Sequence, residues 1–286
     1  MNQRVAVLGT GIMGHGMTLA LLHAGCEVAV WNRTPEKARR LADDGARVAA
    51  SVGDALAGAE VVLTMLYDGQ AVLQVAGDFQ DSFPAGAVWL QTSTVGAEWM
   101  ARLADLAGRA NLPLLDAPVL GTKQPAEKGE LTALVSGPED LIERAGPVLS
   151  ALTTKVVRAG GQLGAATALK LACNAWLATI TAGLAQSLAL AKGQGLDPEL
   201  FLQAIDGSGV NMPYAKLKGG SMLAGEYPAA FTVDNLAKDL GLIDDAAANA
   251  QVDTGLLDAL RARFTAASEA GHGSQDIAAV YTSFRS

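Results

Sequence analysis

The sequence predicts an α/β protein in which a doubly wound parallel sheet is followed by an all-helical domain. Up to about residue 160, short apolar strand-like runs alternate with helical patterns, and the first run leads into a glycine-rich turn. From about Gly164 onward only helical patterns and turn signals remain. Alternating strands and helices imply parallel strands with right-handed crossovers. We therefore expect two domains, residues 1–161 and residues 162–286.

The strand-like runs of the first domain are short and separated by helical patterns. RVAVLG precedes a helical pattern over about residues 11–23, and EVAVWN precedes another that begins near Pro35. The later runs are VVLTML, AVWLQT, LPLLDAP and LTALVSG, with amphipathic segments such as EWMARLADLAGRA between several of them. This pattern is typical of a parallel sheet covered by helices on both faces.

The second domain is expected to be helical, with turns at GLDP, DGSG and GGSMLAGEYP. Its first helix has no charged residue from Leu171 to Ala191. The run reaches the length of about 20 residues that spans a bilayer. It is rich in Ala, however, and contains the polar residues Asn174, Thr179, Thr181, Gln186 and Ser187. We therefore interpret it as a buried central helix.

Composition and charge exclude several classes of partner. The formal net charge is −8, with 29 acidic against 21 basic residues and no basic cluster, so a nucleic-acid partner is not expected. Cys26 and Cys173 lie far apart without metal-ligand spacing, so neither a disulfide nor a metal site is expected. The start MNQRVAVLGTG has no signal-peptide pattern, and we expect a cytoplasmic protein without a membrane partner.

The turn after the first strand is G-x-G-x-x-G, from Gly9 to Gly14. Between a strand and a helix, such a turn lets the backbone approach a pyrophosphate, which then lies on the helix N-terminus of a Rossmann-type fold. A glycine turn without a ligand is the alternative. The predicted cofactor-binding residues here and at the end of VVLTML are Gly9, Gly11, Ile12, Met13, Gly14, Met65 and Leu66.

The second strand ends in Asn32-Arg33-Thr34, where an acidic residue would bind the ribose 2′-hydroxyl of NAD(H). No carboxylate repels a 2′-phosphate, Arg33 can pair with it, and Asn32 and Thr34 can donate hydrogen bonds. The sequence therefore favours NADP(H), with NAD(H) possible. The alternative for Arg33 is a solvated loop cation.

Together these motifs resemble the β-hydroxyacid dehydrogenase family, which includes 3-hydroxyisobutyrate dehydrogenase and the glyoxylate/succinic semialdehyde reductases. The resemblance rests on GTGIMG with WNRT, DAPVLGTKQPAEKG from Asp116, GQLGAATALKLACN from Gly161, FTVDNLAKD from Phe231 and GHGSQD from Gly271. TKQPAEKGEL is most similar to the NADPH-dependent semialdehyde reductase branch.

The resemblance implies that Lys170 is the catalytic acid/base and that Asn174 holds the substrate. Residues four apart on a helix lie on one face, about 6 Å apart at Cβ, so their side chains can converge on one oxygen. The position of Lys170 just past the predicted boundary also favours a domain interface, where ligand sites tend to lie. The alternative for Lys170 is a helix-terminal charge that reaches water.

Other site residues follow from the same resemblance. Thr94 is expected beside substrate or cofactor, and Lys238 near the anionic end of either, unless they are ordinary surface or cap residues. Leu120-Gly121-Thr122 stands where the family has a serine followed by glycine, which hold the substrate carboxylate. Leu120 removes that hydroxyl. Either Thr122 and the backbone amides of residues 121 and 122 suffice for an acid, or the substrate is less polar.

The sequence thus predicts an NADPH-dependent oxidoreductase that interconverts small aldehydes or semialdehydes and β- or γ-hydroxy acids. The first alternative is an imine reductase or a reductase of less polar carbonyl compounds on the same fold, although Lys170 argues against it. The second is a non-catalytic interaction module, as some relatives that lack the lysine are. By analogy with the family, the helical domain is expected to form a homodimer or higher oligomer.

Overall fold

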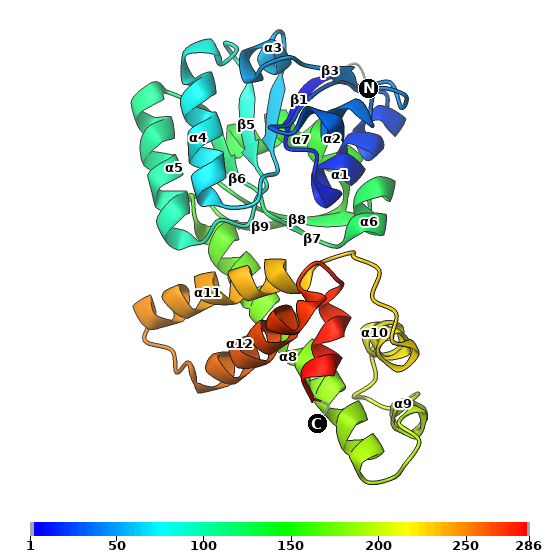
Figure 1. Ribbon diagram of the computed structural model, residues 1–286. Coiled ribbons are helices and arrows are strands. Elements are labelled where there is room, and N and C mark those ends of the chain that lie inside the picture. Colours follow the sequence, from blue (N-terminus) through cyan, green and yellow to red (C-terminus); the bar gives the residue numbers. More distant parts are fainter. Residues whose placement is uncertain (1–2, 285–286) are drawn as a thin grey trace. The chain divides into compact units, whose positions relative to one another are not determined.

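The computed structural model describes residues 3–284, apart from the side chain of Gln80. The chain forms two compact units, residues 1–170 and residues 171–286 (Figure 1). The division falls inside the long helix α8 (Ala165–Gly193), so that Lys170 is the last residue of the first unit. The expected domain boundary between residues 161 and 162 lies slightly earlier in the chain and stays a prediction.

The described part of the first unit contains one nine-stranded sheet flanked by helices. The strands are β1 (Arg4–Leu8), β2 (Glu27–Trp31), β3 (Arg47–Val48), β4 (Val61–Thr64), β5 (Val88–Gln91), β6 (Leu114–Asp116), β7 (Val119–Leu120), β8 (Leu131–Ser136) and β9 (Thr153–Gly160). The helices are α1 (Ile12–His23), α2 (Pro35–Arg39), α3 (Val52–Leu56), α4 (Gly69–Phe79), α5 (Ala97–Ala110), α6 (Lys123–Lys128) and α7 (Glu139–Leu152), with a 3-10 turn η1 (Gln80–Ser82).

The strand order is β3-β2-β1-β4-β5-β6-β8-β7, with β9 paired to β8. The predicted parallel arrangement holds from β3 to β6. It fails at β8, which runs antiparallel to β6 and β7, because the connection from β7 to β8 is shorter than a parallel crossover requires. Strand β9 was not predicted, since most of its residues are exposed and it lacks an apolar run.

Helices cover both faces of this sheet, as a doubly wound fold requires. Buried residues of α1, α2, α6 and α7, such as Met17 and Val148, form the core on one face. Those of α3, α4 and α5, such as Phe79 and Leu103, form the core on the other, and Figure 1 shows α4 and α5 across the sheet from α1. The carboxyl ends of β1, β2, β4 and β5 share one edge, where ligands of such sheets bind.

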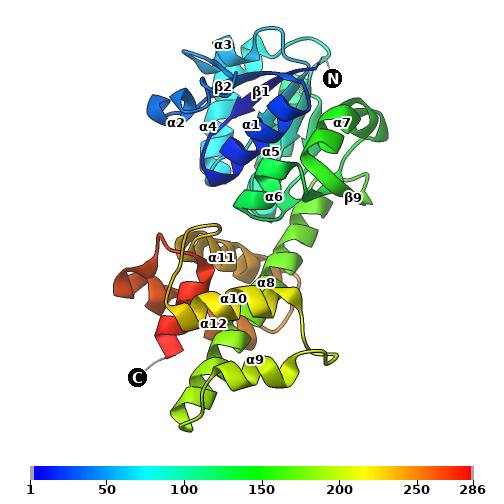
Figure 2. The same cartoon turned by 90° about the vertical axis from the view of Figure 1, so that its right-hand side faces the viewer.

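The second unit is helical. Besides the main part of α8 it contains α9 (Glu199–Ile205), α10 (Pro213–Ala224), α11 (Val233–Asn249), α12 (Gly255–Ala267), a π-helical turn η2 (Ser268–His272) and a 3-10 segment η3 (Ile277–Phe284) (Figure 2). Leu188, Met222 and Phe264 belong to its core. A buried ion pair joins α10 to the start of η3, with Lys218 Nζ 2.6 Å from Asp276 Oδ1.

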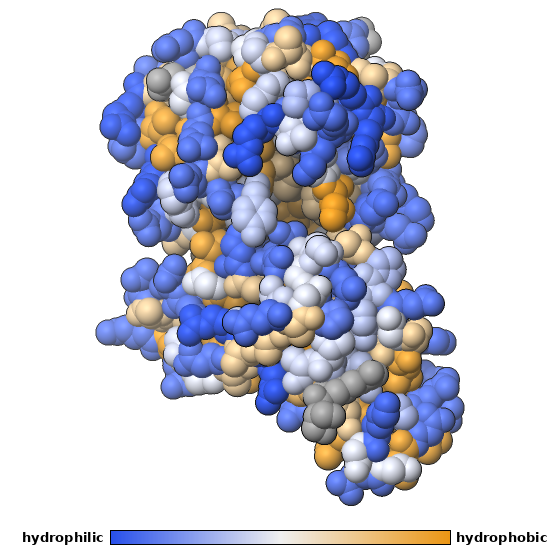
Figure 3. Space-filling model, viewed as in Figure 1, coloured by the Kyte–Doolittle hydropathy of each residue, from blue (hydrophilic) through white to orange (hydrophobic). Residues whose placement is uncertain are grey.

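Helix α8 is not buried on every side within a single chain. Trp176 and Leu190 are 60% and 63% exposed. Among the described helices, α8 alone has the length and composition to cross a membrane, and 44% of its apolar 18-residue stretch is buried in the structure. Figure 3 shows further hydrophobic residues at the surface over α9 and the end of α8, where Leu196 and Leu200 are exposed.

Candidate active site

Close backbone contacts require two glycines where β1 leads into α1: Gly9 in the connecting loop and Gly14 in the first turn of the helix. Gly9 has a φ of 105°, and a Cβ there would lie 2.2 Å from the carbonyl oxygen of Met65. A Cβ on Gly14 would lie 1.9 Å from the carbonyl oxygen of Gly9. At Gly11, in contrast, no heavy atom lies within 4 Å of a Cβ position. The backbone is therefore tightly packed at Gly9 and at Gly14, whereas the space next to Gly11 is open.

The start of α1 offers polar groups to that space. Its N-cap residue is Gly11, there is no side-chain capping hydrogen bond, and the first turn contains no acidic residue. The first N–H groups of the helix, which include those of Ile12 and Met13, therefore remain for an anion. The buried hydroxyl of Thr10 has no hydrogen-bond partner among the described residues. Both features fit the pyrophosphate of a dinucleotide.

Asn32 joins the glycine loop to the end of β2. Its Oδ1 accepts a hydrogen bond from the Thr10 N–H at 3.0 Å, and its Nδ2 donates to the Thr34 carbonyl oxygen at 3.0 Å. The side-chain amide therefore orders the two loops, although the sequence suggested it as a donor to a phosphate. Arg33 and Thr34 are exposed, and Arg33 forms no ion pair with any described residue.

Hydrogen bonds also order the ends of β4 and β5. The Leu66 N–H donates to Ser93 Oγ at 2.9 Å. The buried amide of Gln91 accepts from the Ser93 N–H at 2.9 Å and donates to the Ser93 carbonyl oxygen at 2.8 Å. Thr94 follows directly and is partly buried. Gln91 thus fixes the turn that carries Thr94, a role that sequence reasoning did not assign to it.

The segment after β7 makes a sharp turn. Leu120 ends the strand and is partly buried. Gly121 has a φ of 131°, and a Cβ there would lie 2.5 Å from the Leu131 side chain, so glycine is required. Thr122 is the N-cap residue of α6 but makes no side-chain capping hydrogen bond. The turn thus carries an isobutyl group followed by backbone amides and a hydroxyl.

Asn174, Lys238 and Asp239 come together in the second unit. Asn174 is 2% exposed, and its Nδ2 donates to Asp239 Oδ2 at 2.7 Å. Lys238 Nζ lies 2.6 Å from the other carboxylate oxygen of Asp239. The buried Asp239 therefore links the two predicted site residues, and it was missed because its contact with Asn174 spans 65 positions of the chain.

Lys170 lies one helical turn before Asn174 on the uninterrupted helix α8. It is partly exposed, whereas Asn174 is buried. The two side chains leave the same side of the helix with Cβ atoms about 6 Å apart. The relation between these two residues is set by the single helix α8 that carries both.

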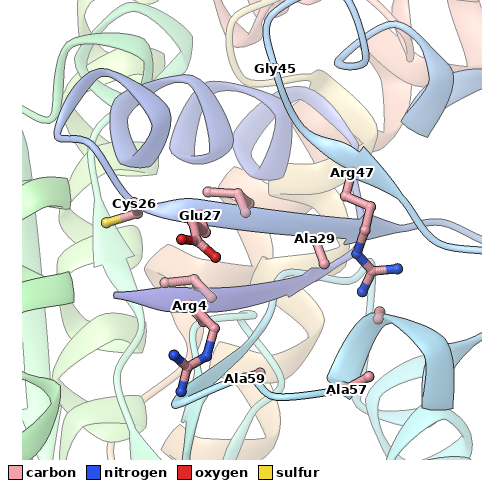
Figure 4. Close-up of a pocket in the computed structure, with 11 residues that line it drawn as sticks. Arg4, Cys26, Glu27, Ala29, Gly45, Arg47, Ala57 and Ala59 are labelled. Carbon is pink, nitrogen blue, oxygen red and sulfur yellow. The ribbon is translucent and has the colours of Figure 1, made fainter. Parts of the chain in front are cut away.

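A pocket of about 290 Å³ lies away from these residues, at the amino ends of β1 and β2 (Figure 4). Arg4 and Arg47 are its basic lining residues. The Arg4 Nε donates to the Gly58 carbonyl oxygen at 2.6 Å, and an Arg47 nitrogen lies 2.7 Å from Asp54 Oδ1. Because these guanidinium groups are engaged, and the glycine loop lies at the opposite ends of the strands, this pocket is not the dinucleotide site.

The fold and the glycine loop are those of a dinucleotide-binding protein of the Rossmann type. Residues 4–161 match the family described as the NAD-binding domain of 6-phosphogluconate dehydrogenase. Residues 164–284 match that described as NAD-binding of NADP-dependent 3-hydroxyisobutyrate dehydrogenase. The chain belongs to the β-hydroxyacid dehydrogenase family, whose members are NAD(P)-dependent dehydrogenases acting on CH–OH groups. The resemblance inferred from the motifs is confirmed.

Curated relatives and solved structures agree with this assignment. The chain is 32% identical to L-threonate dehydrogenase of Cupriavidus necator, over 99% of this chain and 97% of that protein. It is 30% identical to glyoxylate/succinic semialdehyde reductase 2 of Arabidopsis thaliana, over 96% and 78%. The structure of Mycobacterium tuberculosis 3-hydroxyisobutyrate dehydrogenase with L-serine is similar, with a TM-score of 0.89, 29% identity and complete coverage of both chains.

Imine reductases share the fold at lower similarity. The structure of an imine reductase from Pseudomonas sp. has a TM-score of 0.64 and 24% identity, with complete coverage of both chains. At this level the likeness extends to the fold alone. The family assignment therefore rests on the hydroxyacid dehydrogenases.

Proposed function

We propose that the protein is a cytoplasmic NADPH-dependent reductase that interconverts small aldehydes or semialdehydes and β- or γ-hydroxy acids. The observation that supports this most strongly is the pair of Lys170 and Asn174 one turn apart on α8, with the Asn174 amide held by Asp239. When bound, NADPH would supply the hydride that reduces the carbonyl carbon. Lys170 donates a proton to the carbonyl oxygen, and in the oxidative direction it accepts the hydroxyl proton.

The hydrogen bonds around Asp239 give Asn174 a defined role. Because the Asn174 Nδ2 donates to the carboxylate, its Oδ1 is the acceptor that remains for a substrate hydroxyl. Lys238 Nζ lies 2.6 Å from Asp239 Oδ1 and so balances the charge of the carboxylate whose other oxygen accepts from the Asn174 amide. In this scheme Lys238 orders the site through Asp239, in addition to any direct contact with an anionic ligand.

A substrate panel tests the reaction class. NADPH oxidation is measured with succinic semialdehyde, glyoxylate, methylmalonate semialdehyde, an apolar aldehyde and a cyclic imine, and NADP⁺ reduction with L-threonate and 3-hydroxyisobutyrate. We expect turnover with at least one carboxylate-bearing compound and much slower imine reduction. Preferred reduction of the imine would establish the imine reductase alternative. Failure to bind any dinucleotide, measured by NADPH fluorescence, would exclude both enzymatic readings.

Leu120→Ser is expected to raise the preference for carboxylate-bearing substrates over an apolar aldehyde. A hydroxyl group that donates to a charged acceptor contributes about 1.5 kcal/mol or more, or about tenfold in the ratio of kcat/KM values. The measurement is that ratio for succinic semialdehyde and a straight-chain aldehyde of similar length. An unchanged ratio would mean that Thr122 and the neighbouring amides already provide the carboxylate contacts, or that Leu120 lies away from the substrate.

Arg33→Ala is expected to weaken NADPH binding about tenfold and to leave NADH binding nearly unchanged, because only NADPH carries the 2′-phosphate that a guanidinium can pair with. Dissociation constants for both cofactors are measured by fluorescence at two salt concentrations. Arg109→Ala, which removes an exposed cation of α5, is the control. Equal weakening for NADPH and NADH would show that Arg33 does not select the cofactor.

We also propose that the protein is a homodimer or higher homo-oligomer that covers the exposed apolar residues of α8. Trp176 and Leu190 are large side chains that a second copy would remove from water. Light scattering coupled to size exclusion should give at least twice the chain mass of 29.3 kDa. Trp176→Lys should shift the protein toward the monomer, and a monomeric wild type at micromolar concentration would contradict the proposal.

A further inference from the structure

Asp116, the last residue of β6, is a fully buried carboxyl group that accepts four hydrogen bonds. Its Oδ2 accepts from the Gly164 N–H at 3.1 Å, the Thr167 N–H at 2.8 Å and the Ser136 hydroxyl at 3.2 Å. Its Oδ1 accepts from the Thr167 hydroxyl at 2.8 Å. The donors come from the end of β8 and from the beginning of α8, so one carboxyl group connects the sheet to the helix.

Ser136 extends this connection. Its Oγ accepts a hydrogen bond from the Ala166 N–H at 3.0 Å while it donates to Asp116. Three backbone N–H groups at the start of α8, those of Gly164, Ala166 and Thr167, are therefore bound by side chains of β6 and β8. The first N–H groups of a helix have no partner within it, and side-chain acceptors normally fix a helix start. Here those acceptors belong to the sheet.

Thr167 and Lys170 are three residues apart and lie on neighbouring positions of the same helix surface. The rotation and height of α8 at Thr167 therefore set where the Lys170 side chain leaves the helix. Since the sheet that carries Asp116 also carries the glycine loop, we propose that Asp116 is a positioning residue that fixes Lys170 relative to the dinucleotide-binding edge. This inference rests on the proposed role of Lys170 as general acid.

Asp116 is suited to this role and not to proton transfer with a substrate. Its side chain is 0% exposed, and both of its oxygens are already bound by donors. Burial raises the pKa of Asp116, while the hydrogen bonds from Thr167, Ser136 and Gly164 oppose that shift. Its function is therefore to accept hydrogen bonds in a fixed geometry.

Two substitutions test whether the hydrogen bonds of Asp116 position Lys170: one removes these bonds and the other keeps most of them. Asp116→Ala should lower the single-turnover rate of NADPH oxidation by about 10- to 100-fold, because a displacement near 1 Å can have that effect, and should leave the NADPH dissociation constant unchanged. Asp116→Asn should retain most of the rate. One amide oxygen can still accept from both N–H groups, and the Thr167 hydroxyl can turn to accept from the amide nitrogen.

Thr153→Val is a matched control for the loss of a buried hydrogen bond in the same unit. The Thr153 hydroxyl donates to the Leu149 carbonyl oxygen at 2.8 Å. This hydrogen bond does not involve a residue of α8. Thr153→Val should lower the melting temperature without lowering the single-turnover rate. If Asp116→Ala does not fold, Thr167→Val takes its place, since it removes only the hydroxyl bond to Asp116. It should then reduce the rate with an unchanged NADPH affinity.

A double substitution tests whether Asp116 acts through Lys170. In a Lys170→Ala background, Asp116→Ala or Thr167→Val should cause little further loss, because the group they position is already absent. A loss that multiplies with that of Lys170→Ala, or a wild-type rate for the folded single variants, would overturn the positioning role. Wild-type turnover by Lys170→Ala itself would instead overturn the proposed function, so the two failures are distinguishable.

Discussion

Lys170→Ala is expected to lower the single-turnover rate of NADPH oxidation by about 10²- to 10⁴-fold, the usual contribution of a positioned general acid or base. Without the ammonium group, negative charge develops on the carbonyl oxygen during hydride transfer with no proton donor beside it. The neighbouring Asn174 should still bind substrate, because its amide is held by Asp239 independently of Lys170. The loss should therefore appear mainly in kcat, with small changes in KM and in the NADPH dissociation constant.

The control for this prediction is Lys192→Ala, an exposed lysine in the last turn of the same helix. It changes the net charge and the helix composition in the same way but should leave the single-turnover rate at the wild-type value. We specify a single-turnover measurement because product release limits the steady-state rate of many enzymes and can hide a change in the chemical step. A folded Lys170→Ala protein with the wild-type rate would show that another group protonates the oxygen.

The predictable part of the fold is the part that local patterns determine. The glycine turn after β1, the apolar runs of β4 and β5 and the neutral stretch of α8 each have a period or a composition that identifies the element. Strand β9 has no such signal, because it pairs at the edge of β8 with mostly exposed residues. The antiparallel direction of β8 depends on the length of a connection and on tertiary pairing, which hydrophobic periodicity does not encode.

The residues of the candidate site likewise fall into those that the sequence could relate to one another and those that it could not. Lys170 and Asn174 could be paired from sequence because helical geometry relates residues four apart. The carboxylates that order the helix and the amide could not. Asp116 lies 51 positions from Thr167, and Asp239 lies 65 positions from Asn174. Both residues are buried, and a buried carboxylate needs hydrogen-bond donors or a counter-charge. Their partners are distant in the sequence, so nothing in the local pattern distinguishes them from acidic residues at the surface.

Gly11→Ala and Gly14→Ala are expected to separate cofactor binding from folding. A Cβ at Gly11 meets no atom of the protein, so Gly11→Ala should change the free energy of unfolding by less than about 1 kcal/mol. If the pyrophosphate of NADPH binds at the start of α1, as we propose, the added methyl group would occupy part of its space. The NADPH dissociation constant should therefore rise by about 10- to 100-fold, the equivalent of overpacking by 1–3 kcal/mol.

Gly14→Ala should differ because its Cβ would meet the Gly9 carbonyl oxygen at 1.9 Å even without a ligand. That contact forces the loop apart, so we expect a loss of about 1–3 kcal/mol in the free energy of unfolding together with weaker NADPH binding. Urea unfolding without cofactor and NADPH fluorescence measure the two quantities separately. Gly108→Ala, at an exposed position inside α5 where a Cβ meets nothing, is the control and should bind NADPH normally.

Comparing the NADPH affinity and the stability of Gly11→Ala and Gly14→Ala tests whether the cofactor binds beside Gly11. If both weaken NADPH binding in proportion to their loss of stability, the glycines serve only the fold, and the open space above Gly11 has no ligand. If Gly11→Ala weakens binding while its free energy of unfolding stays within about 1 kcal/mol of the wild-type value, the space is occupied by the cofactor. The second outcome would place the pyrophosphate at the start of α1, on the same sheet whose Asp116 holds the helix of Lys170.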